Sequence, residues 1–145
     1  MVRKFLSEDF QQCCELLIQT YNAPPVNDNW TSERAQIRLK DTIDNKRFIG
    51  YTLWENDVLA GAVFARGRTN HAGNEIVVED LFVSPAHQRK GYGAMLLAAI
   101  EKYSKENGCM NISLVTAIEN PSFDFYKKCG YWHLDFAASM YKRTE

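Results

Sequence analysis

Two glycines stand where a helix is expected to begin, directly after a short basic stretch. The segment "SPAHQRKGYGAMLLAAI" covers residues 84–100, and its apolar spacing predicts a helix that begins near Gly91. Glycine weakens a helix by about 1 kcal/mol relative to alanine, so Gly91 and Gly93 are expected to bring a gain elsewhere. The N-terminus of a helix has unpaired N–H groups and the positive end of the dipole, and it binds phosphate groups. Residues 88–94 therefore predict a site for a pyrophosphate group.

Neighbouring side chains strengthen this prediction, although the glycine spacing alone is a weak signal. Gln88, Arg89 and Lys90 add hydrogen-bond donors and positive charge beside the glycines. A P-loop is excluded because no G-K-[ST] follows, and a dinucleotide fingerprint is disfavoured because its third glycine is missing. The alternative is a loop that needs glycine only for a backbone with positive φ.

Composition limits the classes of protein to which the chain can belong. Its 145 residues fit one domain, 1–145, with 46% hydrophobic and 24% charged residues and a net charge of −1. Near-neutral charge argues against a nucleic-acid partner. No apolar run has the length of a membrane span or of a signal peptide, so a cytoplasmic location is expected. The four cysteines lack the spacing of metal ligands, so no metal site is expected.

Hydrophobic periodicity predicts alternating strands and helices. The predicted strands cover residues 2–5, 47–54, 58–65, 75–83 and 110–117 and two C-terminal segments, 131–137 and 139–143. The predicted helices follow Ser7, run from Thr31 or Ser32 to about Asp41 with Ile37 on the apolar face, and cover residues 91–107 and 121–129. Residues 66–74 are expected to form a polar loop. The strand–helix–strand order over 75–116 predicts a parallel strand pair. The fold class is therefore α/β or α+β, with a mixed sheet of six or seven strands and about four helices.

Two motifs in this order resemble those of the GNAT N-acetyltransferase superfamily. The stretch "LFVSPAHQRKGYGAMLL" is similar to its acyl-CoA loop, Q/R-x-x-G-x-G/A, which falls on Gln88, Gly91 and Gly93. The stretch "ENPSFDFYKKCGY" resembles its second signature, N-x-x-[AS]-x-x-[FLY]-Y-x-x-x-G-[FY]. The resemblance implies a GNAT-like sheet in which a splayed parallel strand pair binds CoA.

The resemblance also implies which residues bind acetyl-CoA, the expected cosubstrate. In the family, the backbone of the first splayed strand binds the pantetheine arm. The implied cofactor-binding residues are Phe82, Val83, Gln88, Arg89, Lys90, Gly91, Tyr92, Gly93, Ala94 and Asn120. One position departs from the family, because Glu119 occupies the usual asparagine position and Asn120 comes one place later.

Direct attack of an amine on the thioester requires a base and an acid. An amine with a pKa near 10 arrives protonated, and a carboxylate is a suitable base. Glu79 is expected to share a strand face with Val77, Leu81 and Val83, which makes it the candidate base, with Asp80 as the reserve. The alternative for Glu79 is to cap a sheet bulge or to pair with Arg66.

The resemblance gives Tyr126 the role of general acid that protonates the departing CoA thiolate. A phenol with a pKa of about 10 can do this. The alternative is an apolar role for the Tyr126 ring on the buried face of its helix.

These observations together predict an enzyme of the acyltransferase class that transfers groups other than aminoacyl groups. It is expected to be an N-acetyltransferase that moves an acetyl group to a primary amine in a ternary complex. A polyamine, another small amine or a peptide amine all fit as acceptor. For a cationic acceptor, Glu75, Glu79, Asp80 and Glu119 would supply an acidic pocket if they converge. The alternative is a weakly catalytic acyl-CoA-binding or sensor domain of the same fold. A homodimer through Trp132, Phe136 and Tyr141 is also compatible with the sequence.

Overall fold

The computed structural model of the chain describes residues 1–145, which divide into a first unit, Met1–Val115, and a second unit, Thr116–Glu145. The sheet of the first unit has the order β1 (Val2–Lys4), β2 (Phe48–Glu55), β3 (Val58–Asn70), β4 (Gly73–Val83) and β5 (Asn111–Ser113). Its helices are α1 (Phe10–Asn22), α2 (Ser32–Ile43) and α3 (Tyr92–Glu106), with short 3-10 turns η1 (Ser7–Asp9) and η2 (Pro85–His87). The expected mixed α/β class and the parallel β4–β5 pair are confirmed.

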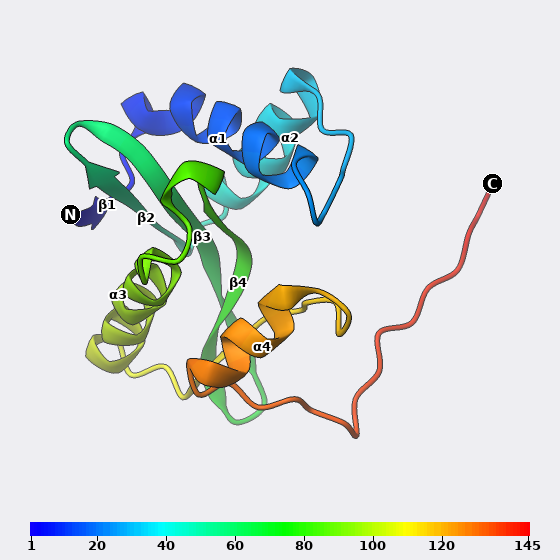
Figure 1. Cartoon of the computed structure of the whole chain (residues 1–145). Helices are drawn as coiled ribbons and strands as arrows, with labels where there is room; N and C mark the ends of the chain where they lie inside the picture. Colours follow the sequence, from blue (N-terminus) through cyan, green and yellow to red (C-terminus); the bar gives the residue numbers. More distant parts are fainter. The chain divides into compact units, whose positions relative to one another are not determined.

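The helices of the first unit cover both faces of the sheet. Figure 1 shows α1 and α2 together on one face and α3 on the other. Phe64 and Phe82 stack at the centre of the core under α1 and α2, with ring centroids 6.1 Å apart. Leu96 and Ile100 of α3 pack on the opposite face with Val63. Each face of β3 and β4 is therefore buried over most of its length.

A tight turn joins β2 to β3, as the sequence predicts. Asn56 and Asp57 have φ of 50° and 66°. Two left-handed residues in succession form the hairpin turn whose twist matches that of the flanking strands. Asn and Asp tolerate this conformation better than other residues with side chains.

The expected polar loop over residues 66–74 is wrong. Residues up to Asn70 continue β3, and β4 already begins at Gly73. The side chains are polar because they pair across the strands: Arg66 bonds Glu79, and Arg68 bonds Glu75. Opposite charges facing each other across a strand pair stabilise it, so strand structure here needs no apolar residues.

Helix α2 begins as predicted but turns a different face to the core. The Thr31 side chain accepts a hydrogen bond from the Arg34 N–H and caps the helix. Ile37 is 55% exposed, so its expected place on the apolar face is wrong. The buried residues are Ala35 and Leu39, with Thr42 one turn further, because that stripe contacts the sheet and α1.

The sheet has five strands instead of the expected six or seven. The second unit contains α4 (Pro121–Lys128), and residues 131–145 form neither helix nor strand. Trp132 and Phe136 alternate as in a strand, but they are 87% and 88% exposed. A strand needs a hydrogen-bonded neighbour as well as an alternating pattern, and these residues pair with none.

Ile37 at the surface and Phe64 in the core give a test of the fold, because their loss should affect stability differently. Phe64→Ala is expected to lower the free energy of unfolding by about 3–5 kcal/mol, because it empties the centre of the core. Ile37→Ala is expected to change it by about 0.5 kcal/mol or less, because that side chain lies at the surface. Urea unfolding of both variants measures this, and a loss above about 2 kcal/mol in Ile37→Ala would place the wrong face of α2 against the core.

Candidate active site

Strands β4 and β5 are paired over only part of β4. The parallel pairing joins Glu75–Val77 to Asn111–Ser113, whereas β4 continues to Val83. Residues 78–83 therefore have a strand on the β3 side and none on the β5 side. This partial separation is what the splayed pair predicted from the sequence requires.

Backbone alternation decides which residues of β4 face the open side. The Ser84 N–H donates to the Ala60 carbonyl at 2.8 Å, which makes this a hydrogen-bonded pair of the antiparallel ladder. Every second residue then pairs with β3, so Phe82 directs its N–H and C=O to β3. Leu81 and Val83 direct theirs to the open side. The open side therefore carries the backbone groups of Leu81 and Val83, whereas those of Phe82 pair with β3. The ligand contacts expected for Phe82 and Val83 remain predictions.

β4 has one residue more than β3 in the middle of their pairing. Phe64 lies opposite Asp80 and Ala65 lies opposite Val78, so Glu79 is the extra residue of a β-bulge. Residues opposite each other share a face of the sheet. Because Phe64 packs under α1 and α2, Asp80 lies on that face too.

Glu79 lies on the same face, held by Arg66. The Arg66 Nε donates to Glu79 Oε1 at 2.9 Å, and Arg66 follows Phe64 by two residues on β3. The Arg66 pair, one of the two alternatives for Glu79, is thus present, and Glu79 is itself the extra residue of the bulge. Its side chain is nevertheless 28% exposed, and its second carboxylate oxygen has no protein partner. Glu79 therefore has a lone pair accessible from outside the sheet.

The bulge also corrects the expected strand face. Leu81 and Val83 pack with the cluster on the α3 side, opposite to Glu79. The expectation that Glu79 shares their face is wrong, because the extra residue interrupts the alternation. Val77 precedes the bulge and lies opposite Arg66, so it keeps the face of Glu79.

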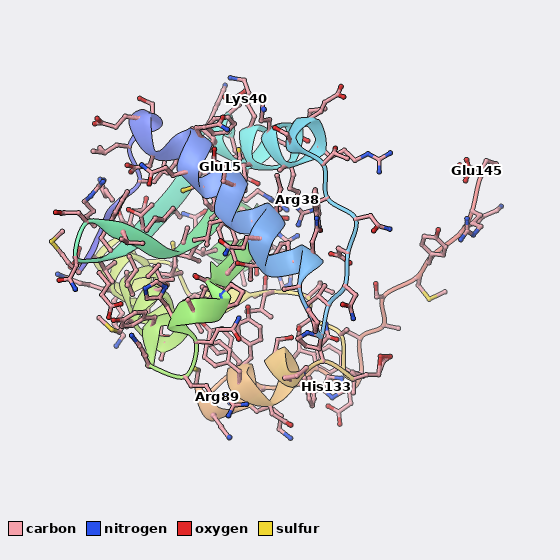
Figure 2. The ribbon with its side chains drawn as sticks, turned by 45° about the horizontal axis from the view of Figure 1, so that its top comes forward. Glu15, Arg38, Lys40, Arg89, His133 and Glu145 are labelled. Atoms are coloured by element: carbon pink, nitrogen blue, oxygen red, sulfur yellow. The ribbon has the colours of Figure 1, made fainter.

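Asp80 is buried and fully engaged. Its Oδ2 accepts from Arg38 Nε at 3.0 Å, and its Oδ1 accepts from the Tyr21 hydroxyl at 3.1 Å. Figure 2 shows Arg38 on α2, the helix that lies beside α1. Burial raises the pKa of the Asp80 carboxyl, and the bonds from Arg38 and Tyr21 oppose that rise. The arrangement ties α1 and α2 to β4 and leaves Asp80 little access to a substrate.

A third carboxylate, Glu75, is paired in the same way. Its Oε2 lies 2.8 Å from Arg68 Nη2, and Asn111 of β5 donates to its Oε1 at 2.8 Å. The bond from Asn111 is the main cause that lowers the pKa of Glu75, and the bond from Arg68 adds to it. An arginine thus pairs with each of the three carboxylates Glu75, Glu79 and Asp80. They therefore do not form the acidic pocket considered for a cationic acceptor. Glu119 belongs to the second unit.

The loop before α3 presents backbone donors at the Val83 end of β4. Gly91 has φ of 79°, and no atom lies within 4 Å of the place where a Cβ would stand. Glycine is needed there for the left-handed backbone, and the space in front of it is open. The first-turn N–H groups of Tyr92, Gly93 and Ala94 have no partner inside the helix. The loop thus has the open donors that a phosphate group needs.

Three basic or polar side chains of this loop differ in their hydrogen-bond and ion-pair partners. Gln88 donates its side-chain N–H to the Val83 carbonyl at 3.1 Å. Lys90 bonds Glu55 at the end of β2, whereas Arg89 has no ion pair and lies in the loop ahead of α3 (Figure 2). Arg89 also has φ of 66°, a strained value for a residue with a side chain.

Comparison with known proteins agrees with this geometry. The model of the acetyltransferase (GNAT) family matches residues 6–131. The chain belongs to the GNAT acetyltransferase family. Over 70 residues it is 27% identical to streptothricin acetyltransferase of Streptomyces lavendulae, a match that covers 48% of this chain and 37% of that protein. The chain therefore matches little more than a third of the length of this curated relative.

Solved structures of acetyltransferases have the same fold. A possible acetyltransferase from Clostridium difficile 630 superposes with a TM-score of 0.84 and 13% identity, covering 100% of this chain and 98% of that one. An aminoglycoside N-acetyltransferase in complex with CoA superposes with a TM-score of 0.79 and 16% identity, covering 99% of this chain and 93% of that one. At these identities the comparison concerns the fold alone.

The second GNAT signature lies in the second unit. Asn120 precedes α4, and its carbonyl accepts from the Phe123 N–H at 3.0 Å. The Tyr126 ring packs against Phe125 and Tyr131, with centroids 5.2 and 5.8 Å away. The alternative considered for Tyr126 was an apolar role on a buried helix face; the ring has aromatic neighbours, but α4 has no buried residue. The cofactor contact of Asn120 and the acid role of Tyr126 remain predictions.

Sequence reasoning missed two residues that bond the candidate site: Arg38, which bonds Asp80, and Glu55, which bonds Lys90 and Tyr92. Arg38 had a signal, because it lies on the helical stripe of Ala35, Leu39 and Thr42, where a charged side chain needs a buried partner. Glu55 had none, because an acidic residue before a hairpin turn is common. The structure assembles no group of three or more His, Cys, Asp or Glu side chains that would hold a metal ion. None of its helices has the length and apolar character needed to cross a membrane.

The burial of Asp80 predicts how stability depends on pH. Because its pKa is raised above the ordinary 3.8, the folded chain binds more protons than the unfolded chain in the pH range above that value. The free energy of unfolding of the wild type, relative to Asp80→Asn, is then highest below about pH 3.8 and falls as pH rises through the folded pKa. Urea unfolding of both proteins between about pH 3.5 and pH 7 measures the difference. A difference that grows with pH would show that the Arg38 bond outweighs burial.

Proposed function

We propose that the chain is an acetyl-CoA-dependent N-acetyltransferase that acetylates a primary amine by direct attack in a ternary complex. One observation carries the proposal: the open edge of β4 leads from the donor-rich loop to an accessible carboxylate, Glu79. A cosubstrate bound along that edge brings its thioester to the residue that can take a proton.

The loop and the open edge fit the two parts of acetyl-CoA. The pyrophosphate binds the N–H groups at the start of α3, with Arg89 as the nearby unpaired cation. The pantetheine arm runs along Val83 and Leu81 as an added strand would, and uses the Val83 N–H and the backbone groups of Leu81, because the Val83 carbonyl already accepts from Gln88. About 13 Å of strand separates Val83 from Glu79, at about 3.3 Å per residue, so the arm ends near the bulge.

Glu79 is the proposed base. An alkylammonium with a pKa near 10.4 must lose a proton before its nitrogen can attack. The free oxygen of Glu79 takes that proton, directly or through one water molecule. The amine lone pair then attacks the thioester carbonyl, the C–S bond breaks and the CoA thiolate leaves. The nitrogen of the new amide loses its second proton to water. Asp80 supports Glu79 from the next position and does not contact the acceptor.

Two residues of the second unit complete the proposal. The Tyr126 hydroxyl donates a proton to the departing thiolate, and Asn120 binds the pantetheine arm. Both assignments rest on the family motif "ENPSFDFYKKCGY". Loss of the Tyr126 hydroxyl leaves much of the activity, since a thiolate is already a good leaving group.

The charges around the bulge favour an acceptor with few positive charges. Structural neighbours include aminoglycoside acetyltransferases, and aminoglycosides carry several ammonium groups. In this chain, however, Glu79 pairs with Arg66 and Asp80 pairs with Arg38. A polycation would meet two guanidinium groups beside the reacting amine, so a small monoamine or the amine of an amino acid or peptide fits better.

Two further assignments from the sequence stay proposals. The exposed Trp132, Phe136 and Tyr141 support self-association of the chain into a homodimer. The cytoplasmic location expected from the sequence is the second.

Glu79→Gln tests the catalytic proposal. The variant is expected to lower kcat/KM at least about 100-fold at neutral pH, as for loss of a general base. The loss shrinks as pH rises towards the pKa of the amine, because free amine then needs no base. Thiol release from acetyl-CoA across a panel of amines measures both. Glu15→Gln on the outer face of α1 is the matched control and keeps wild-type rates.

Outcomes of this assay separate the functions. Equal rates for Glu79→Gln and wild type at every pH would remove Glu79 from the mechanism. Tight CoA binding by calorimetry without turnover on any amine would identify the acyl-CoA-binding domain that the sequence left as the alternative. Absence of CoA binding would overturn the proposed use of the loop.

The acceptor preference has its own test. Wild type is expected to use a monoamine with at least about tenfold higher kcat/KM than a polycationic aminoglycoside. Arg66→Gln removes one guanidinium and leaves the negative charge of Glu79 uncompensated, so it shifts the ratio towards the polycation. A wild-type preference for the aminoglycoside would contradict the charge argument.

A further inference from the structure

Glu55 joins the far end of β2 to the loop that precedes α3. It is the last residue of β2 and lies directly before the turn at Asn56 and Asp57. Its side chain is 30% exposed, and it contacts side chains from both ends of the loop. Nothing in its own sequence context predicts this role.

Three loop residues bind this one carboxylate. Tyr92 donates its hydroxyl to Glu55 Oε1 at 2.5 Å, and Lys90 Nζ lies 3.3 Å from the same oxygen. His87 Nε2 lies 3.0 Å from Oε2. The hydroxyl of Tyr92 and the ammonium of Lys90 lower the pKa of Glu55, which keeps its carboxylate ionised.

The loop between these anchors has a backbone that needs support. Arg89 and Gly91 both have left-handed φ, 66° and 79°. Such residues persist where the surrounding structure holds them. The rings of His87 and Tyr92 stack at 6.4 Å, one on each side of the strained stretch; Tyr92 hydrogen-bonds Glu55, and His87 lies against the same carboxylate. The carboxylate therefore fixes the ends of the segment whose N–H groups point to solvent.

We infer that Glu55 is a positioning residue that holds the loop of residues 87–92 in the conformation that binds the pyrophosphate of CoA. This rests on the proposed use of CoA and adds a residue outside both family motifs. Lys90 and Tyr92 then serve as anchors towards Glu55, and Arg89 is the loop cation that remains for the phosphates.

The sign of the effect distinguishes positioning from electrostatics. A carboxylate close to an anion site disfavours the anion, so its removal would tighten CoA binding if charge were all that mattered. The Lys90 ammonium already compensates the charge of Glu55, and the Tyr92 hydroxyl donates a hydrogen bond to it. Loss of its hold on the loop is therefore expected to dominate, and CoA binding weakens because the loop must be ordered at the moment of binding.

The experiment compares Glu55→Gln with wild type on two thioesters. With acetyl-CoA, KM is expected to rise about tenfold, the effect of one charge-assisted hydrogen bond, while kcat changes less than about twofold. With S-acetylpantetheine, which lacks the pyrophosphate, kcat/KM of the variant and the wild type should agree. Calorimetry with free CoA should show the same tenfold loss of affinity without turnover.

Two further variants keep the test independent of folding. Tyr92→Phe removes one of the bonds and should raise KM for acetyl-CoA in the same direction. The double variant should show less than the product of the two single effects, because both act through one contact. Glu106→Gln on the exposed side of α3 is the matched control and should leave both thioesters unchanged.

Each contrary result has a distinct meaning. Unchanged or tighter CoA binding in Glu55→Gln overturns the inference, as does an equal loss with S-acetylpantetheine. If wild type itself does not bind CoA, the proposed function fails before Glu55 is tested.

Discussion

The structure depends on backbone groups that lack a strand partner. Beyond Val77, β4 has β3 on one side and no strand on the other. Leu81 and Val83 direct their N–H and C=O groups to that open side. Exposed strand edges attract another extended chain, and proteins usually cover or interrupt them. Here the edge ends at a helix N-terminus with its own free donors, so a ligand with an extended arm and an anionic head satisfies both sets of groups.

Charged pairs join β4 to the elements around it. Arg38 reaches from α2 to the buried Asp80, and Arg66 on β3 holds Glu79. Removal of one partner from a buried pair is costly, because the other charge is then left without compensation. The arginines therefore fix the position of α2 and of the bulge together. They also compensate the negative charges of Asp80 and Glu79 on this face of the sheet.

The sequence predicted the elements better than the faces that they present. The helix after Gly91, the Asn56–Asp57 turn and the parallel β4–β5 pair were all predictable from local signals. The face of the sheet on which Glu79 lies was not predictable. An alternating pattern assumes an uninterrupted strand, and the extra residue of the bulge has no signature in the sequence. The polar composition of residues 66–74 predicts a loop, because these side chains find their partners only once the strands are in register.

Long-range contacts explain the other differences. Glu55 lies far along the chain from Tyr92, and only the sheet brings the end of β2 to the start of α3. Ile37 followed a helical spacing, but the position of α1 and the sheet decides which stripe of α2 is buried. The alternating residues near Trp132 resemble a strand, yet a strand depends on a partner edge that local sequence does not supply.

The bulge at Glu79 limits the changes in length that β4 can accept. Deletion of a single residue near Glu79 would restore regular pairing with β3 and remove the extra position. Leu81 and Val83 pack in the core after the bulge, and Ile76 and Val78 pack in it before the bulge. A deletion would therefore change the positions and side-chain directions of Glu79 and Asp80, which lie between them. Insertions and deletions should therefore be tolerated in the turn at residues 71–72 but not within β4, where one residue sets both the phase of the strand and the direction of its carboxylates.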